Sequence, residues 1–332
     1  MKYRPLGRTG LHVSELGFGC GGVGGLFVRG ERCEMLRTVK RAIELGVNYF
    51  DTASIYGDGK SESSLGAVLR KLGVDALVGT KVRLSASDMG RIPDAVMESV
   101  EGSLKRLRLD CVDLIQLHNP IGLYRDPERG YVGLDDLKPV MLAFQSLQEQ
   151  GKVKFCGING LGETEALLQA VELAGAQSIQ ICYNLINPSA GYKVPRSFPF
   201  QDFCQLMQKA SRNGLGVIAI RVLAGGALSG TDNRHPNADE SVSPIASGRH
   251  YAEDVARSRM FQFLVEQGYV DSLVEAAIRF VVSNSAVSTA LVGFSSLEQL
   301  DQAAECVAKG PLPSKALNQI EEVWPLYSKA DF

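Results

Sequence analysis

The sequence predicts an α/β fold in which eight parallel strands and their covering helices close into a (β/α)8 barrel. Eight short apolar runs alternate with amphipathic stretches along the 332 residues. Apolar strands separated by helices are typical of a parallel sheet that helices cover. Eight such units fit a closed barrel, whereas an open doubly wound sheet has about six strands. No linker or block of charge interrupts the pattern, so residues 1–332 are expected to form a single domain.

The chain is expected to begin with a β-hairpin, because KYRPL and HVSEL flank the turn GRTG. The glycines of that turn supply the positive φ that a tight turn needs. The eight apolar runs that follow are the predicted barrel strands. They are Glu15–Gly19, Val47–Asp51, Ala76–Lys81, Val112–His118, Val153–Ile158, Ser178–Tyr183, Gly216–Arg221 and Ser288–Gly293.

The segments between these runs have the i, i+3, i+4 apolar spacing of helices, and several end in Gly, as helix C-caps do. The predicted helical ranges are 33–46, 61–73, 92–109, 134–151, 164–175, 200–214 and 272–284. Two connections, 119–133 and 223–250, are too long to be simple turns. In a barrel both follow the carboxyl ends of strands, where active sites are built.

Composition argues against several classes of function. A net charge of −2 gives no electrostatic reason to expect nucleic acid or an anionic membrane as a partner. The segment MKYRPLGRTG does not resemble a signal peptide, and no apolar run approaches the roughly 20 residues that span a bilayer. The seven cysteines are scattered without C-x-x-C spacing, and the four histidines are far apart. We therefore expect free thiols, no metal site and a cytoplasmic protein.

The segment LGFGCGGVGG contains a literal G-x-G-x-x-G at Gly17, Gly19 and Gly22. A dinucleotide-binding Rossmann turn requires a helix immediately after the motif and an acid about 20 residues later. Here the next helical pattern begins near Arg32, and the first acid that ends an apolar run is Asp51. The context therefore argues against a Rossmann turn.

Four polar residues stand at or just beyond the ends of consecutive predicted strands: Asp51, Tyr56, Lys81 and His118. Taken singly, Asp51 would cap a turn, Lys81 would extend to solvent, His118 would be a structural histidine and Tyr56 would pack. Adjacent barrel strands would instead bring an acid, a phenol, a cation and an imidazole together at one mouth. Their joint occurrence favours a catalytic site.

These residue types suit proton transfer to or from an oxygen. A phenol has a pKa of about 10, and a neighbouring ammonium lowers it, while a carboxylate keeps the ammonium charged and oriented. A neutral imidazole can hydrogen-bond a substrate oxygen and polarise its carbonyl. Since neither a hydrolase-type nucleophile–base pair nor a metal site is evident, the natural accompanying step is hydride transfer from a cofactor.

At these residues the chain resembles the aldo-keto reductase superfamily, and the resemblance covers nearly the whole chain. The matching segments are YRPLGRTGLHVSELGFG, YFDTASIYGDGKSESSLG, VGTKV and DLIQLHNP. The resemblance implies a catalytic tetrad of Asp51, Tyr56, Lys81 and His118, with Tyr56 as acid in reduction and base in oxidation. It also implies a nicotinamide cofactor bound across the barrel mouth without a Rossmann fold.

The resemblance further implies a set of cofactor contacts. Gly19 to Gly22 would line the nicotinamide end, Asn159 takes the place of the family's serine, and Gln180 takes that of its carboxamide-binding glutamine. Arg221 would contact the pyrophosphate or form a salt bridge. The expected cofactor-binding residues are Cys20, Gly21, Gly22, Asn159, Gln180, Arg221, Leu223, Gly225, Gly293, Phe294, Ser295 and Gln299.

Cofactor preference is expected to lean towards NAD(H). Relatives that prefer NADP(H) carry a lysine or arginine where this chain has Gly293, Phe294, Ser295 and Gln299, and Ala303 replaces an adenine-contacting asparagine. A 2′-phosphate needs charge-assisted donors. A cation from the long loop, Arg234 or Arg249, would reverse the preference.

The leading hypothesis is therefore an NAD(P)-dependent oxidoreductase that interconverts an aldehyde, ketone or sugar hemiacetal with its alcohol or lactone. The chain resembles NAD-linked aldose dehydrogenases of the superfamily in its opening. The alternatives are a slow, cofactor-binding regulatory subunit and a lyase or isomerase on the same barrel. A polar small molecule is the expected substrate, and the sequence does not indicate an oligomeric state. The expected substrate contacts are Val23, Ile55, Asn119 and Tyr124, with Arg125, Tyr131, Trp324 and Tyr327 also near the mouth.

Overall fold

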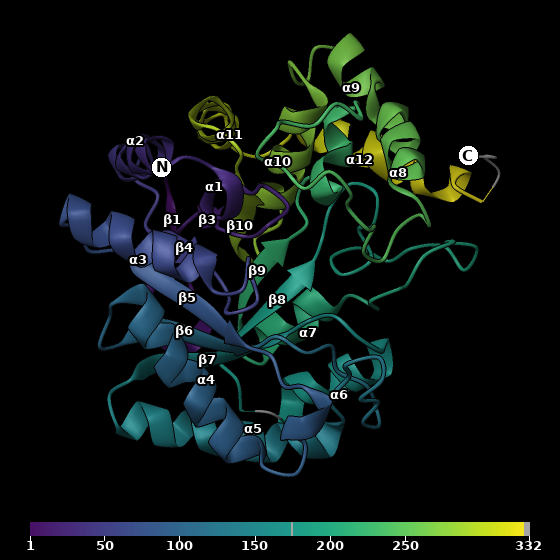
Figure 1. Ribbon diagram of the computed structural model, residues 1–332. Coiled ribbons are helices and arrows are strands. Elements are labelled where there is room, and N and C mark those ends of the chain that lie inside the picture. Colours follow the sequence, from purple (N-terminus) through teal and green to yellow (C-terminus); the bar gives the residue numbers. More distant parts are fainter. Residues whose placement is uncertain (174, 329–332) are drawn as a thin grey trace.

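The structure, a computed structural model, describes residues 1–173 and 175–328. Its centre is a closed barrel of parallel strands with helices around it (Figure 1). Neighbouring strands follow chain order, and β10 pairs with β3 to close the barrel. This confirms the predicted fold class, and no predicted strand end is more than two residues from the observed one. The strands are β3 Leu16–Gly19, β4 Tyr49–Asp51, β5 Leu77–Val82, β6 Val112–Leu117, β7 Val153–Asn159, β8 Ser178–Cys182, β9 Gly216–Ile220 and β10 Val287–Gly293.

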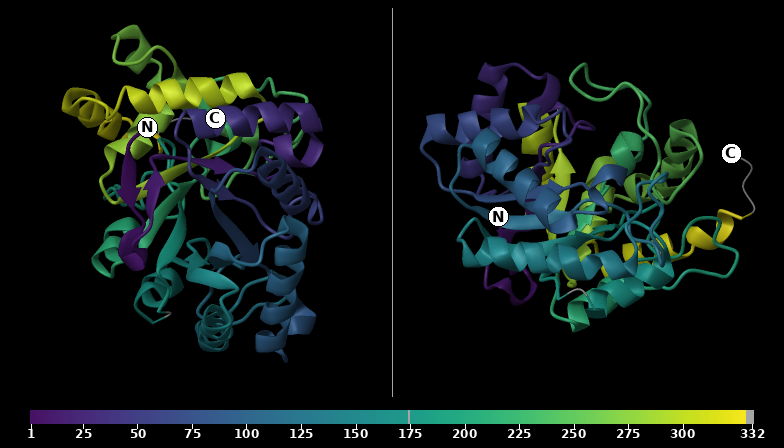
Figure 2. Two further views of the ribbon diagram at one scale, coloured as in Figure 1. Left: turned by 90° about the vertical axis from the view of Figure 1, so that its left-hand side faces the viewer. Right: turned by 60° about the horizontal axis from the view of Figure 1, so that its bottom comes forward.

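The predicted hairpin is present as β1 (Tyr3–Pro5) paired antiparallel with β2 (His12–Ser14). The turn glycines Gly7 and Gly10 have φ of 53° and 77°, a region that side chains with a Cβ rarely occupy. Leu6 of the turn packs with apolar side chains from inside the barrel. The hairpin therefore covers the amino-terminal end of the barrel (Figure 2), and the carboxyl end is left for a site.

The helices expected from apolar spacing are present, and they surround the strands in the two views of Figure 2. They are α2 Arg32–Glu44, α3 Lys60–Leu72, α4 Ile92–Leu107, α5 Leu134–Glu149, α6 Thr164–Leu173, α7 Leu206–Arg212 and α10 Leu273–Ser283. Residue 174, within the predicted range 164–175, lies outside the described residues. Helix α7 begins later than predicted because Cys204 and Gln205 have φ of 49° and 58°, which no right-handed helix contains.

Several shorter elements were not predicted. Helix α11 (Leu297–Ala308) follows the last strand, and α12 (Ser314–Glu321) follows α11. The long connection that begins at 223 starts with a 3-10 segment and ends at α8. The remaining elements are α1 Leu26–Arg29, α8 Tyr251–Ser258, α9 Phe263–Glu266 and the 3-10 segments η1 Gly7–Thr9, η2 Ala86–Asp88, η3 Ala224–Ser229, η4 Arg259–Phe261 and η5 Trp324–Leu326.

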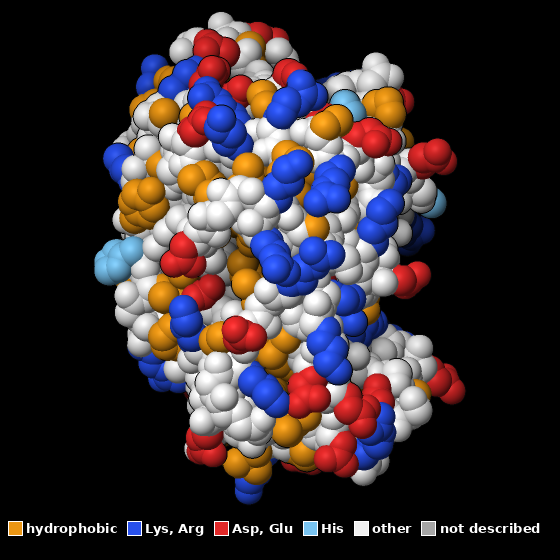
Figure 3. All heavy atoms as spheres, turned by 60° about the vertical axis from the view of Figure 1, so that its left-hand side comes forward, with side chains coloured by type: hydrophobic (Ala, Val, Ile, Leu, Met, Phe, Trp, Pro, Cys, Tyr) orange, Lys and Arg blue, Asp and Glu red, His pale blue; other side chains and the backbone are white. Residues whose placement is uncertain are grey.

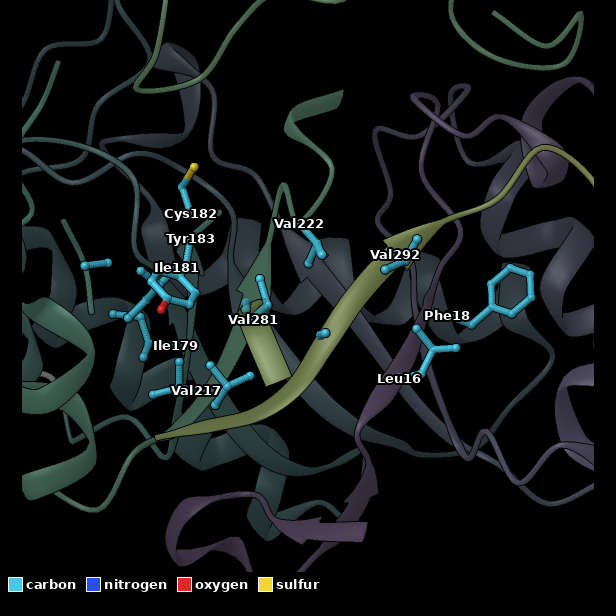
Figure 4. Close-up of a cluster of buried hydrophobic side chains, with 14 of the residues drawn as sticks. Leu16, Phe18, Ile179, Ile181, Cys182, Tyr183, Val217, Val222, Val281 and Val292 are labelled. Atoms are coloured by element: carbon cyan, nitrogen blue, oxygen red, sulfur yellow. The ribbon is translucent and has the colours of Figure 1, made fainter. Parts of the chain in front are cut away.

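Alternation along the strands separates two apolar regions. One set of strand side chains packs outward against the helices and forms the main core, of which Figure 4 shows members on β3, β8, β9, β10 and α10. Phe18 of β3, for example, meets Phe27 of α1 edge-on at 5.7 Å between ring centroids. A smaller cluster fills the barrel interior, where Tyr49, Leu114 and Ile218 lie next to the hairpin. Residues that alternate with the outward set therefore point into the barrel interior, and those near the carboxyl ends of the strands lie next to its open mouth.

Within residues 1–173 and 175–328, no helix is long and apolar enough to cross a membrane. On the face in Figure 3, Lys and Arg side chains lie among Asp and Glu side chains, in keeping with the small net charge of −2.

Candidate active site

A cavity of about 520 Å³ opens at the carboxyl ends of the barrel strands. Its walls include Asp51, Tyr56 and His118, and the glycine run after β3 forms one side. Lys81 is 1% exposed and lies beneath the cavity rather than in its wall. The structure therefore brings the four predicted tetrad residues together around one space, although they come from separate strands and loops.

Asp51 and Lys81 form a buried ion pair, with side chains exposed by only 2% each. The Lys81 Nζ donates to Asp51 Oδ1 and, at 2.7 Å, to the Thr52 carbonyl. Burial acts to lower the pKa of Lys81, but the Asp51 carboxylate and the Tyr56 phenol outweigh it, so this pKa is raised. Lys81 is therefore a charged ammonium at neutral pH.

The second carboxylate oxygen of Asp51 has its own donors. Tyr49 Oη donates to Oδ2 at 3.0 Å, and Gln180 Nε2 donates to it at 2.6 Å. A buried carboxylate is tolerated only when its oxygens are satisfied. Both oxygens of the buried Asp51 carboxylate therefore have hydrogen-bond donors.

Tyr56 lies between the cation and the imidazole. The Lys81 Nζ is 4.9 Å from the centroid of the Tyr56 ring, and a hydrogen bond with the phenol contributes to the raised pKa of Lys81. The rings of Tyr56 and His118 meet edge-on, with centroids 5.7 Å apart. The phenol is thus placed at the cavity wall with an ammonium beside it.

His118 is neutral at physiological pH. Burial, and then the positive charges of Lys81 and Arg83, lower its pKa from 6.5 to about 3. Its Nδ1 is buried with no hydrogen-bond partner in the described structure. The imidazole is therefore held as an uncharged group in the cavity wall, able to hydrogen-bond a ligand oxygen without adding a charge.

Most of the predicted cofactor contacts line the cavity. They are Gly21, Gly22, Asn159, Gln180, Arg221, Leu223, Gly225, Gly293, Phe294, Ser295 and Gln299. Two of their amides already have partners, because Gln180 donates to Asp51 and Asn159 Nδ2 donates to the His118 carbonyl at 2.9 Å. Each of these amides keeps its oxygen and one N–H for a ligand.

Arg221 lies just beyond the end of β9 with a left-handed backbone, at φ 57°. Asn184 Nδ2 donates to the Arg221 carbonyl at 2.9 Å, which holds this turn. The guanidinium makes one long bond, 3.3 Å to the Ser243 carbonyl, and no carboxylate among the described residues pairs with it. Sequence analysis left Arg221 with two possible roles, a contact to the pyrophosphate or a salt bridge. The structure shows no salt bridge to Arg221 among the described residues, so the guanidinium is available to a ligand in the cavity.

The far end of the cavity is formed by the segment after β10. The Ser295 amide donates to Gln299 Oε1 at 2.8 Å, and Ser295 Oγ donates to the Gly24 carbonyl at 2.6 Å. Of the long-loop arginines, Arg249 is exposed outside the cavity. The Arg234 side chain lies in the wall, but it donates to the carbonyls of Asp239, Gly225 and Val23.

Apart from Arg234, sequence analysis did not identify the residues of the loop segment 231–239 as part of the wall. Asn237 joins it to the segment after β10, because Nδ2 donates to the Ser295 carbonyl at 3.0 Å. Asp239 pairs with Arg29 of α1 at 2.7 Å. The length of the connection 223–250 was the sequence signal that this loop takes part in the site, but length does not reveal which loop residues face inward. The wall residues from this segment are Thr231, Asn233, Arg234, His235 and Ala238.

Three predicted contacts, Cys20, Asn119 and Tyr124, do not line the cavity. Cys20 is 1% exposed, with burial raising the pKa of its thiol well above the usual value. Asn119 is fully buried, and its amide bonds to the backbone of Leu84 and to the Gly130 carbonyl, which fixes its own loop. Tyr124 is 85% exposed on the outside. The place of a residue just after a predicted strand indicates at which end of the barrel it lies, but it does not indicate where the side chain points.

The predicted substrate contacts Val23 and Ile55 do line the cavity. The other residues expected near the mouth do not, since Arg125 pairs with Asp136 and Trp324 Nε1 donates to the Leu185 carbonyl at 2.9 Å. Tyr131 and Tyr327 also lie outside the wall. Among the described residues, no group of three or more His, Cys, Asp or Glu side chains is arranged to hold a metal ion.

Solved structures give a likeness in fold. The chain superposes on the aldo-keto reductase AKR11C1 from Bacillus halodurans in its holo form with a TM-score of 0.73. That match covers 98% of this chain and 96% of the other, at 24% sequence identity.

Curated relatives are similar over most of their length. The chain is 28% identical over 319 residues to L-galactose dehydrogenase of Arabidopsis thaliana, covering 93% of this chain and 89% of that protein. It is also 28% identical over 330 residues to pyridoxal 4-dehydrogenase of Microbacterium luteolum, covering 90% and 91% respectively. The model of the Aldo/keto reductase family matches residues 15–325. With this match over a barrel whose mouth gathers Asp51, Tyr56, Lys81 and His118, the chain belongs to the aldo/keto reductase family and is an oxidoreductase.

Proposed function

We propose that this oxidoreductase depends on NAD(P) and interconverts an aldehyde, ketone or sugar hemiacetal with its alcohol or lactone. The observation that carries the proposal is the buried Asp51–Lys81 pair beneath Tyr56, beside a neutral His118 in the cavity wall. These groups supply a proton donor and acceptor, and a hydrogen-bonding group for an oxygen.

In the proposed reduction, the Tyr56 phenol donates a proton to the carbonyl oxygen, and in oxidation it takes the proton back. The Lys81 ammonium, held by Asp51, favours the charge that develops on the phenol oxygen as the proton leaves. His118 hydrogen-bonds the same substrate oxygen as an uncharged imidazole. A nicotinamide held in the cavity by residues such as Arg221 and Gln180 would supply the hydride in reduction and accept it in oxidation.

The residues of the cavity suit a dinucleotide. The Arg221 guanidinium, which pairs with no carboxylate among residues 1–173 and 175–328, matches the charge of a pyrophosphate. Gly21, Gly22 and Gly293 line the wall without side chains, which allows a flat ring to approach the backbone closely. We propose that Gln180 and Asn159 offer their amide oxygens to the carboxamide.

We further propose a preference for NAD(H). The Gln299 side-chain oxygen accepts a hydrogen bond from the Ser295 amide, and the Arg234 guanidinium donates to backbone carbonyls. Neither offers the free charge-assisted donor that a 2′-phosphate needs. Glu34, which accepts from Asn237 at 3.2 Å, adds negative charge near this end.

The substrate is proposed to be small and polar. The relatives named above are dehydrogenases of L-galactose and of pyridoxal, both hydroxylated compounds. The free cysteines found among the described residues support a reducing compartment, and we propose the cytoplasm.

The test is Tyr56→Phe, assayed for turnover and, separately, for cofactor binding by direct titration with NADH and NADPH. Turnover with aldehydes and aldoses should fall by about 1,000-fold or more while the cofactor Kd is unchanged, because only the proton donor is lost. Tyr124→Phe, which removes an exposed phenol outside the cavity, is the matched control. Wild-type kcat in Tyr56→Phe would exclude Tyr56 as the acid–base group. Cofactor binding without turnover by the wild type would favour a regulatory subunit.

A further inference from the structure

Tyr49 is a phenol inside the barrel that hydrogen-bonds Asp51. It lies two residues before Asp51 on β4, so both side chains point into the barrel. The Tyr49 side chain is 1% exposed and does not line the cavity. Its Oη donates to Asp51 Oδ2 at 3.0 Å, on the opposite oxygen from the one that Lys81 holds. The phenol therefore approaches the ion pair from below, on the side away from any substrate.

The neighbouring strands carry glycine where this ring needs space. A Cβ added to Gly79 of β5 would lie 2.4 Å from Tyr49 Oη and 3.1 Å from its Cζ. A Cβ added to Gly17 of β3 would lie 3.3 Å from Tyr49 Cδ1, and nearer still to Thr289 Oγ1 at 2.9 Å and Leu291 Cδ1 at 3.2 Å. This glycine therefore makes room for the ring together with two β10 side chains. Gly79 pairs in register with Asp51 itself, so the glycine opens the barrel at the height of the carboxylate. Neither glycine has a positive φ, so the backbone conformation does not require glycine at these positions. The reason for glycine is the lack of room for a side chain.

We propose that Tyr49 is a positioning residue, which orients the Asp51 carboxylate beneath Lys81 and Tyr56, and that Gly79 and Gly17 are the spaces that admit its ring. The inference rests on the proposed role of Tyr56 as the acid–base group. Lys81 is held by one oxygen of Asp51, and the other oxygen would have only Gln180 as a donor without Tyr49. Because Gln180 also faces the cavity, Tyr49 is the donor to Oδ2 that ligand binding does not reach.

The electrostatic consequence has a definite sign. Burial, and then the Asp51 carboxylate, raise the pKa of Tyr49 well above its usual value, so it stays a neutral donor. Its O–H places a positive end against Asp51, and removing it makes the potential at the ion pair and at the Tyr56 phenol more negative. A more negative potential favours the protonated forms of the groups above it. The titratable groups that act on Tyr49 are Asp51, Asp113 and Tyr56. Lys81, Cys20, His118 and Arg221 in turn act on Asp51, Lys81 or Tyr56.

The first experiment is the pH dependence of kcat in both directions for the wild type and Tyr49→Phe. The inflection should move to higher pH by about half a unit, and kcat at its optimum should fall by about 10-fold, as expected for one lost hydrogen bond. The Kd for NADH, titrated directly, should stay within about twofold, because the phenol is outside the cavity. Tyr183→Phe is the matched control, since it removes another fully buried phenol that does not line the cavity.

A second variant separates positioning from general packing. Gly79→Ala pushes against the phenol oxygen and should reproduce the shift of the pH profile on its own. In the Tyr49→Phe background that oxygen is gone, so Gly79→Ala should then add less than about half of its effect, which a double-mutant cycle measures. If Tyr49→Phe fails to fold, the pH profile of the single variant Gly79→Ala still tests the proposal.

The outcomes are distinct. A shifted profile and a non-additive cycle support the inference. Loss of stability with an unshifted profile, or additive effects of Tyr49→Phe and Gly79→Ala, would overturn it. Tyr56→Phe is measured in parallel: if that variant keeps its turnover, the proposed acid–base role has failed. If Tyr56→Phe is inactive but Tyr49→Phe is unshifted, only the positioning role has failed.

Discussion

Protonation of His118 should make the folded state sensitive to mild acid. The folded-state pKa is lowered to about 3, against 6.5 for the unfolded chain, because partial burial and then the charges of Lys81 and Arg83 disfavour the protonated imidazole. Between these values the unfolded state binds the extra proton, so stability falls as the pH drops through 6.5. The full difference corresponds to about 5 kcal/mol, reached only near pH 3.

At about pH 5 the linkage predicts a loss of about 2 kcal/mol relative to about pH 8 from this one residue. The assay is urea unfolding of the wild type, His118→Asn and His118→Phe across that range. Neither variant titrates at this position, so the two should share a flatter pH dependence even if their stabilities differ. Histidine NMR of the wild type, titrated to about pH 4.5, should show a resonance that does not move. If the difference in unfolding free energy between wild type and both variants stays constant with pH, the reasoning is refuted.

Three other predictions concern the charges of the site. Lys81→Met should cost about 3 kcal/mol in urea unfolding and about 100-fold in kcat, because Asp51 is left buried without its cation; unchanged stability would contradict this. Gln299→Arg should tighten NADPH binding by about 10-fold with little change for NADH, measured by titration; equal gains for both cofactors would show that the position does not recognise the 2′-phosphate. Arg221→Gln should weaken cofactor binding by about 10-fold while kcat at saturation is kept, and an unchanged Kd would remove the arginine from the cofactor site.

The barrel itself could be predicted because the information is local. Each strand is a short apolar run and each long helix has its own apolar spacing, so counting the units gave the closed architecture. Asp51, Tyr56, Lys81 and His118 could be grouped for a related reason. In a parallel barrel all strand ends lie at one rim, and therefore position after a strand predicts proximity without any knowledge of contacts.

Side-chain direction could not be predicted in the same way. Asn119 follows β6 only one residue after His118, yet it turns into its own loop, where the backbone of Leu84 and Gly130 holds the amide. The partners of Arg221 depend on a carbonyl more than 20 residues away in sequence, and the loop segment 231–239 reaches the wall through Asn237. Such contacts are set by how distant segments meet when the barrel closes.

Tyr49 shows where the two kinds of information meet. The alternation of β4 alone places Tyr49 and Asp51 on the same inward face. Only the closed barrel sets Gly79 and Gly17 on either side of the ring, because strand register and curvature decide which residue of each neighbour shares its height. Sequence period thus determined the fold and the residues at its open end. The tertiary structure decided which of them face the cavity, since that depends on packing between strands that the chain brings together from far apart.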